Sequence, residues 1–157
     1  MNPPRRRCGF MAKSAKRGFW KKKTDIEIYI RDCPHEKILA LISRVLGPLE
    51  KKHEDTGQTL YHCIRHGHII PVVITDGIAA GPFTGIWFNS GETPWAHDVE
   101  CAREIHLKTG CTVRCDPCGV YTQVDPYSDI FLQIADQKEE LIDWSDALSQ
   151  SEEIKEL

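Results

Sequence analysis

Two segments of the chain each join a strand pattern to an amphipathic helix pattern through a loop that contains proline, and this repeated order constrains the fold more than any other feature. In the first segment, Ile26, Ile28 and Ile30 alternate with polar residues, which is the period-two pattern of a strand with one buried face. Pro34 follows, and apolar residues then recur at i, i+3, i+4 and i+7 over residues 38–49. That spacing predicts a helix whose apolar stripe faces a core.

The second segment repeats this order between residues 83 and 110. Residues 83–90 have apolar side chains at both alternating positions, which predicts a strand covered on both faces and therefore central in its sheet. Thr93 and Pro94 are suited to the N-cap and first turn of a second helix, which ends near Gly110. The apolar stripe of this helix consists of Trp95, Val99, Ala102 and Ile105.

The segment between the two helices predicts a hairpin. Residues 59–65 and 68–75 have strand patterns and are joined by a tight connection, whereas the polar residues 51–57 predict a loop. Pro71 lies within the second strand of this hairpin. Because proline cannot donate to a ladder, it indicates an edge position or a bulge.

The last part of the chain adds further strands and completes the predicted fold. Residues 111–115 and 129–135 predict strands, and residues 139–144 fit either a last edge strand or the start of a helix. The order of elements predicts an α+β fold, with a mainly antiparallel sheet and two helices packed on one face. The two strand-helix-strand segments can be laid over each other as repeats, although their identity is too low to establish a duplication.

The formal charge of −3 averages parts of the chain that differ strongly. Residues 1–23 hold nine basic residues and no acid, and the other 134 residues hold 11 basic and 23 acidic residues, a charge of −12. The sequence therefore predicts a basic tail without stable structure at 1–23, one folded domain at 24–146 and an acidic C-terminal tail at 147–157. The alternatives for 1–23 are a nucleic-acid-binding arm and a targeting peptide. The acidic body repels phosphate, so nucleic acid could be bound only by that tail.

The compartment predicted from the sequence is the cytoplasm. No apolar stretch approaches the ~18–20 residues that span a bilayer, and residues 1–23 lack the apolar segment of a secretory signal. The seven cysteines are an odd number. In a cytoplasmic chain we expect thiols or metal ligands rather than disulfides.

One Cys/His cluster predicts an alternative function as a zinc-binding protein or small enzyme. Cys115 and Cys118 form a Cys-x-x-Cys pair, which can supply two of the four ligands of a zinc ion, and His66 and His68 could supply the others. A second Cys-x-x-Cys pair is missing. The sequence also lacks a phosphate-binding glycine loop and the common hydrolase motifs, so we predict no catalytic residues and no cofactor other than this alternative zinc.

The connection before the second helix predicts a partner-binding surface. A loop exposes side chains, and an aromatic residue beside an acidic helix start is typical of interfaces. The alternative interpretation of the tryptophan in this segment is a core residue beneath the helix. The predicted surface consists of Asn89, Glu92, Trp95, His97, Asp98 and Glu100.

Three sequence segments carry a resemblance to known proteins: residues 24–33 (TDIEIYIRDC), 93–103 (TPWAHDVECAR) and 113–117 (VRCDP). Together they resemble a family of small, uncharacterised bacterial proteins, a likeness that spans about residues 24–135. The resemblance implies a shared fold and no particular activity. In size and acidity the chain is also similar to immunity proteins that neutralise secreted nuclease toxins. The sequence therefore favours a non-enzymatic cytoplasmic protein whose acidic surface binds a basic partner, such as an immunity or antitoxin-like inhibitor.

Overall fold

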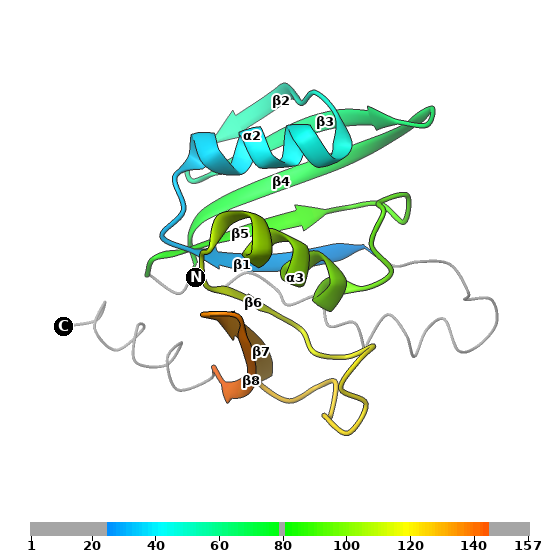
Figure 1. The fold of residues 1–157 in the computed structure, drawn as a ribbon. Helices are drawn as coiled ribbons and strands as arrows, with labels where there is room; N and C mark the ends of the chain where they lie inside the picture. The colour runs from blue at the N-terminus through cyan, green and yellow to red at the C-terminus, as the bar shows by residue number, and fades with distance from the viewer. Residues whose placement is uncertain (1–24, 79–80, 145–157) are drawn as a thin grey trace.

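The computed structural model describes residues 25–78 and 81–144, which form two helices and eight strands (Figure 1). The predicted tails at 1–23 and 147–157 lie outside these residues. None of the described helices is long and apolar enough to cross a membrane. The elements, in chain order, are β1 (Ile26–Arg31), α2 (His35–Leu46), β2 (Glu50–Asp55), β3 (Gln58–Arg65), β4 (His68–Ile78), β5 (Phe83–Phe88), α3 (Asp98–Thr109), β6 (Val113–Cys115), β7 (Ile130–Ala135) and β8 (Lys138–Asp143).

The strands form a single sheet in the order β2-β3-β4-β5-β1-β6-β7-β8, and every pair of neighbours is antiparallel. The α+β class with a mainly antiparallel sheet is therefore confirmed. Strand β5 lies between β4 and β1, so the central position predicted for residues 83–90 is also confirmed. Ile28 of β1 pairs with Ile86 of β5 at the middle of the sheet.

The main core joins both helices to six of the strands in one buried cluster. Ile26, Ile28 and Ile30 of β1 are fully buried, as their alternation predicts. Burying an isoleucine or leucine side chain contributes roughly 1.5–3 kcal/mol, so this cluster dominates the stability of the fold. The helices contribute Ile38, Leu41, Ile42 and Leu46 from α2, and Val99, Cys101, Ala102 and Ile105 from α3.

A second, aromatic cluster lies on the opposite side of β1. Tyr29 alternates with Ile28 and Ile30 and therefore points away from the main core. Trp144 contacts Tyr29, with ring centroids 5.3 Å apart, and contacts Phe83 and Phe131 at 5.0 Å each. The guanidinium of Arg114 lies 4.7 Å from the centroid of the Trp144 ring, in a cation–π contact. The centre of the sheet is thus covered on both faces.

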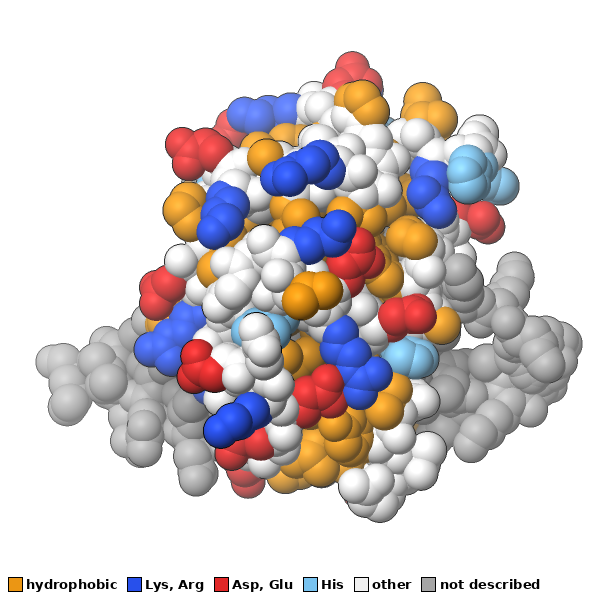
Figure 2. Space-filling model, in the orientation of Figure 1, with side chains coloured by type: hydrophobic (Ala, Val, Ile, Leu, Met, Phe, Trp, Pro, Cys, Tyr) orange, Lys and Arg blue, Asp and Glu red, His pale blue; other side chains and the backbone are white. Residues whose placement is uncertain are grey.

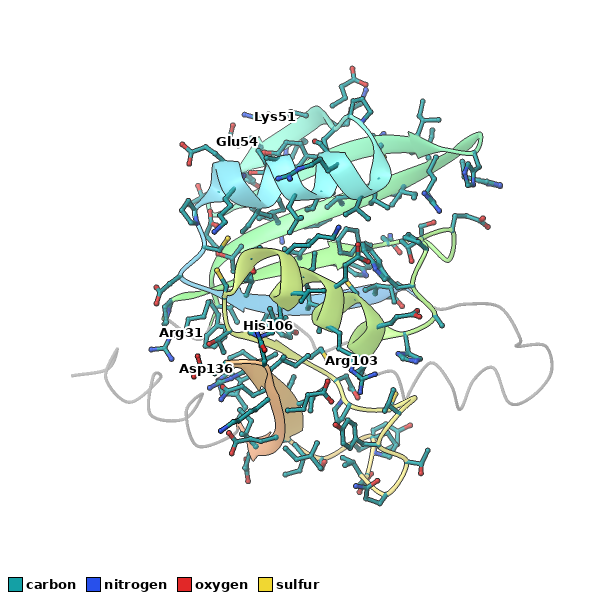
Figure 3. The ribbon with its side chains drawn as sticks, viewed as in Figure 1. Arg31, Lys51, Glu54, Arg103, His106 and Asp136 are labelled. Atoms are coloured by element: carbon teal, nitrogen blue, oxygen red, sulfur yellow. The ribbon has the colours of Figure 1, made fainter. Side chains whose placement is uncertain are left out.

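His106 joins α3 to the turn between β7 and β8, and Figure 3 shows it beside Asp136 of that turn. Its Nδ1 lies 2.7 Å from the carbonyl oxygen of Cys111, and its Nε2 accepts a hydrogen bond from the backbone N–H of Gln137 at 3.0 Å. Asp136 and Gln137 have φ angles of 51° and 63°, which is the left-handed conformation of a two-residue hairpin turn. The imidazole therefore fixes the hairpin against the helix.

The prediction of a loop at residues 51–57 is wrong, because Glu50–Asp55 form strand β2. All six residues of β2 are exposed, and they pair with β3 from Glu50 opposite His62 to Asp55 opposite Gln58. An edge strand with no buried side chain shows no apolar alternation, so the sequence pattern does not reveal it. For residues 139–144 the strand alternative is right, since they fall largely within β8.

The edge position inferred from Pro71 is wrong, because β4 lies between β3 and β5. The strand does have a register shift against β5, but it lies between Thr75 and Ile78 rather than at Pro71. Pairing between β4 and β5 begins at Val72, and the carbonyl oxygen of Pro71 accepts a hydrogen bond from the backbone N–H of Asn89 at 2.9 Å. The N–H that proline lacks would point to the same side, toward Asn89. The missing donor therefore falls where the pairing between β4 and β5 ends.

The second helix begins later than the sequence predicts. Its N-cap is His97 rather than Thr93, and Pro94 lies in the preceding loop. Thr93 is 1% exposed, and its hydroxyl donates to the carbonyl oxygen of Trp95 at 3.5 Å. The loop before α3 is thus held by its own buried side chains.

Candidate functional site

The predicted partner surface lies on the loop between β5 and α3 and on the first turn of α3. Two of its six residues are interior in this structure: Trp95 is 2% exposed and Asp98 is 4% exposed. His97 is half-buried, and Asn89, Glu92 and Glu100 are exposed. The structure therefore brings the six residues into one region but leaves only four of them available for contact with a partner.

Trp95 anchors the loop to the core. Its ring packs against Phe88, with centroids 5.1 Å apart, and its Nε1–H donates to Oε1 of Glu104 at 2.7 Å. The placement matches the interpretation of this tryptophan as a core residue. An indole bound in this way fixes the path of the loop on either side of it.

The start of α3 is closed by a reciprocal cap. Nδ1 of His97 accepts a hydrogen bond from the backbone N–H of Glu100 at 3.3 Å, and Oε1 of Glu100 accepts one from the backbone N–H of Ala96 at 2.5 Å. The pattern resembles a capping box, except that the carboxylate of Glu100 binds the N–H of the residue before the N-cap. Earlier in the loop, Oε1 of Glu92 lies 3.8 Å from Nε2 of His68, and both side chains are exposed. The carboxylate of Glu100 is thus held in a defined position.

Acidic side chains lie close together at the start of α3. Oδ1 of Asp98 accepts a hydrogen bond from the backbone N–H of Glu27 at 3.2 Å. Burial raises the pKa of Asp98 well above its usual value, and the nearby carboxylates of Asp116, Glu27 and Asp25 raise it further. Burial and the carboxylates of Asp98 and Asp116 likewise raise the pKa of the Cys115 thiol. Both buried groups therefore favour their neutral, protonated forms.

The four residues of the predicted metal alternative are not brought together by the sheet. His66 and His68 flank the exposed turn between β3 and β4, while Cys115 is fully buried on β6. Strands β5 and β1 lie between, and at about 4.8 Å per strand they hold β4 about 14 Å from β6. In the described parts of the chain, no three His, Cys, Asp or Glu side chains converge on a possible metal position. Zinc binding stays a prediction, which metal analysis of untagged protein tests.

The cysteines differ in their chemical state. Cys118 is disulfide-bonded, so the prediction of thiols or metal ligands rather than disulfides is wrong for this residue. Among the cysteines that the structure describes, five are free: Cys33, Cys63, Cys101, Cys111 and Cys115. Cys33 interacts with the Cys111 thiol, and burial, followed by this neighbour, raises the pKa of Cys33 to about 11. At neutral pH the Cys33 thiol is protonated and is a poor nucleophile.

Arg65 is a polar residue that the sequence analysis did not single out. It is the last residue of β3, and its Nε is buried without a hydrogen-bond partner. The signal was present in the alternation of the strand: Tyr61 and Cys63 point into the core, and Arg65 follows them on the same face.

The comparisons of the chain with protein-family models, with curated proteins and with solved structures find no match. The resemblance to a family of small bacterial proteins therefore stays a prediction.

Proposed function

We propose that the chain is a non-enzymatic binding protein that receives a basic protein partner on an acidic loop surface, defined as Asn89, Glu92, His97 and Glu100. The proposed role is that of a cytoplasmic immunity or antitoxin-like inhibitor of a nuclease-type partner in a bacterium. The observation that carries the proposal is the loop itself, since it exposes the carboxylates of Glu92 and Glu100 together with His97 and is anchored to the core by Trp95.

The charge of the folded body supports a basic partner. Residues 25–144 contain ten basic and nineteen acidic residues, a formal charge of −9. A net charge of this size steers an oppositely charged protein toward the surface and raises the association rate. The hydrogen bond that holds Glu100 also lowers the entropy lost on binding, because this side chain is already ordered.

The proposal includes a finer description of the scaffold, in which two strand-helix-strand repeats place both helices on one face of the sheet. Two observations support it. Helices α2 and α3 follow β1 and β5 respectively, which are the paired central strands, and apolar side chains of both helices enter the same buried cluster.

The experiment that tests the proposal compares two variants with equal changes of charge. In the first, Glu92→Gln and Glu100→Gln remove two carboxylates from the acidic loop surface, while the amide oxygen at position 100 can still accept the cap hydrogen bond. In the matched control, Glu50→Gln and Glu54→Gln remove two exposed carboxylates from β2, where Figure 3 shows Glu54 near Lys51. The binding probe is the product of the gene adjacent to the one that encodes this chain, co-expressed and purified with each variant.

The expected result is a complex with a basic protein whose association rate falls by about tenfold at low salt in the first variant. The control should retain the wild-type rate within about twofold, and added salt should reduce the difference between the variants. Equal slowing in both variants would place the interface elsewhere. Failure to retain any basic protein, either from that gene or from a lysate of the source bacterium, would contradict the proposed function.

A further inference from the structure

A groove of about 400 Å³ lies between the C-terminal halves of α2 and α3. Its apolar lining is Leu41, Val45 and Pro94, and its charged lining is Arg44, Arg65, Lys108 and Glu104. Figure 2 looks onto this side of the molecule and shows basic side chains over both helices, with apolar surface between them. The volume falls in the range of roughly 300–1,000 Å³ that is usual for small-molecule sites.

Arg65 is the feature of the groove that calls for a ligand. Its Nε is the one buried side-chain nitrogen or oxygen without a hydrogen-bond partner among the residues that the structure describes. A buried donor on a charged group is strongly disfavoured unless an acceptor satisfies it. The guanidinium group is a rigid fork that fits carboxylate and phosphate oxygens.

The acidic residue of the groove already has its own partners. Oε1 of Glu104 accepts the hydrogen bond from Trp95, and its Oε2 lies 3.6 Å from Nζ of Lys108. The carboxylate is thus compensated by Lys108, and the charges of Arg44 and Arg65 remain. The groove lining is therefore locally positive, and its short-range pairing with an anion opposes the long-range repulsion from a folded body of charge −9.

Favourable interaction with the helix dipoles explains the positions of only some of the basic residues in the groove. Arg44 and Lys108 lie in the last turns of α2 and α3, where a cation interacts favourably with the helix dipole. Arg65 lies at the end of a strand and has no such role. Arg65, whose position the helix dipoles do not explain, is also the residue whose Nε has no hydrogen-bond partner.

We propose that this groove binds a small organic anion. Its carboxylate or phosphate group pairs with Arg65 and is supported by Arg44, and its apolar body lies against Leu41, Val45 and Pro94. The groove shares no residue with the acidic loop surface, although Pro94 belongs to the same loop, and the proposal does not depend on the proposed function, so either can fail alone.

The experiment titrates the full chain at constant ionic strength with three probes: phenyl phosphate, phenylacetate and inorganic phosphate. We expect saturable binding of at least one of the two organic anions with a Kd below about 1 mM. Inorganic phosphate should bind at least about tenfold more weakly, because it leaves the apolar wall uncovered. The organic probe that binds more tightly identifies the oxyanion.

Arg65→Gln should weaken the tighter probe by about tenfold or more, since a charge-assisted hydrogen bond is lost. The matched control is Arg31→Gln, which removes an exposed arginine of β1 and should leave the Kd unchanged within about twofold. Because Arg65→Gln could unfold the protein, the wild-type chain provides a second readout: the Nε–Hε signal of Arg65 in the NMR spectrum should shift with the same Kd. Absence of binding by both organic anions, equal losses in both variants, or an unmoved Arg65 signal would overturn the proposal.

Discussion

Replacement of Trp95 tests whether this residue anchors the core or contacts a partner at the surface. The side chain is 2% exposed, its ring packs against Phe88, and its Nε1–H donates to Glu104 at 2.7 Å. Trp95→Ala removes the whole ring from the core, and truncation of a buried tryptophan costs about 3–5 kcal/mol of unfolding free energy. We therefore expect a loss of about 4 kcal/mol in urea denaturation followed by circular dichroism.

Trp95→Phe divides this loss between packing and hydrogen bonding. Phenylalanine retains an aromatic ring beside Phe88 but has no donor for Glu104. A hydrogen bond to a charged group contributes about 1.5–3 kcal/mol. Because Glu104 is partly exposed and is also near Lys108, water can replace part of this bond, so we expect a loss near 1.5 kcal/mol. The matched control is Leu107→Ala on the same helix, where the side chain is 75% exposed and the change should stay within about 0.5 kcal/mol.

The three variants should differ in stability in a definite order. The alanine variant must be the least stable, the phenylalanine variant intermediate and the Leu107 variant close to wild type. A Trp95→Ala protein that unfolds at the wild-type urea concentration would refute the interior placement. Trp95 would then be a surface residue, and the rigidity ascribed to the acidic loop surface would have no structural basis.

Three further predictions concern a buried carboxylate, a hairpin turn and a thiol. Burial and the Asp116 carboxylate raise the folded-state pKa of Asp98, so wild-type stability that is present below about pH 4 is lost as the pH rises toward that raised pKa. In urea titrations Asp98→Asn should therefore gain stability relative to wild type between about pH 4 and pH 7. A difference between the two proteins that does not change with pH would count against this. Gln137→Gly should raise the unfolding free energy by about 0.5–1 kcal/mol, because a residue with a side chain is strained at a backbone φ of 63°. A loss of stability in this variant would show that the strain is absent. Burial and the Cys111 thiol raise the pKa of Cys33 to about 11. Iodoacetamide should therefore alkylate Cys33 more slowly than Cys111 at about pH 8, and the rate at Cys33 should rise toward about pH 11. Equal alkylation rates at the two cysteines, measured by peptide mass spectrometry, would exclude this.

The regular elements with a buried face could be predicted from the sequence, because burial leaves a period in the chain. Ile26, Ile28 and Ile30 predict β1 by alternation, and the stripe that begins at Ile38 predicts α2. Strand β2 has no such period. Its six residues are all exposed, and backbone hydrogen bonds to β3 rather than side-chain burial hold it in the sheet. Charged side chains suit such an edge because they discourage pairing with other chains.

Neither the sheet order nor the buried acid could be predicted from local pattern. His68 and Cys115 lie on strands separated by two others, and that separation depends on which strands pair across the whole chain. Asp98 was predicted to be exposed at a helix start, but α3 begins at this residue and packs its first turn against the sheet. Trp95 is different, because its spacing from Val99 and Ala102 in the predicted stripe already indicated the core. At this position the periodicity of the apolar residues predicts burial correctly, whereas the loop position predicts exposure.

The same rule of alternation shows why Arg65 matters more than its exposed neighbours. Along β3, Tyr61 and Cys63 are buried, and the next position on that face is occupied by an arginine rather than an apolar residue. A strand that needed only to fill the core would place an aliphatic side chain there, whereas one that needed only solubility would place the charge on the other face. An arginine on the core face with a buried, unpartnered Nε costs about 1–3 kcal/mol, and an anion that pairs with the guanidinium group would offset part of this cost. The groove between α2 and α3 is the space in which such an anion can reach Arg65.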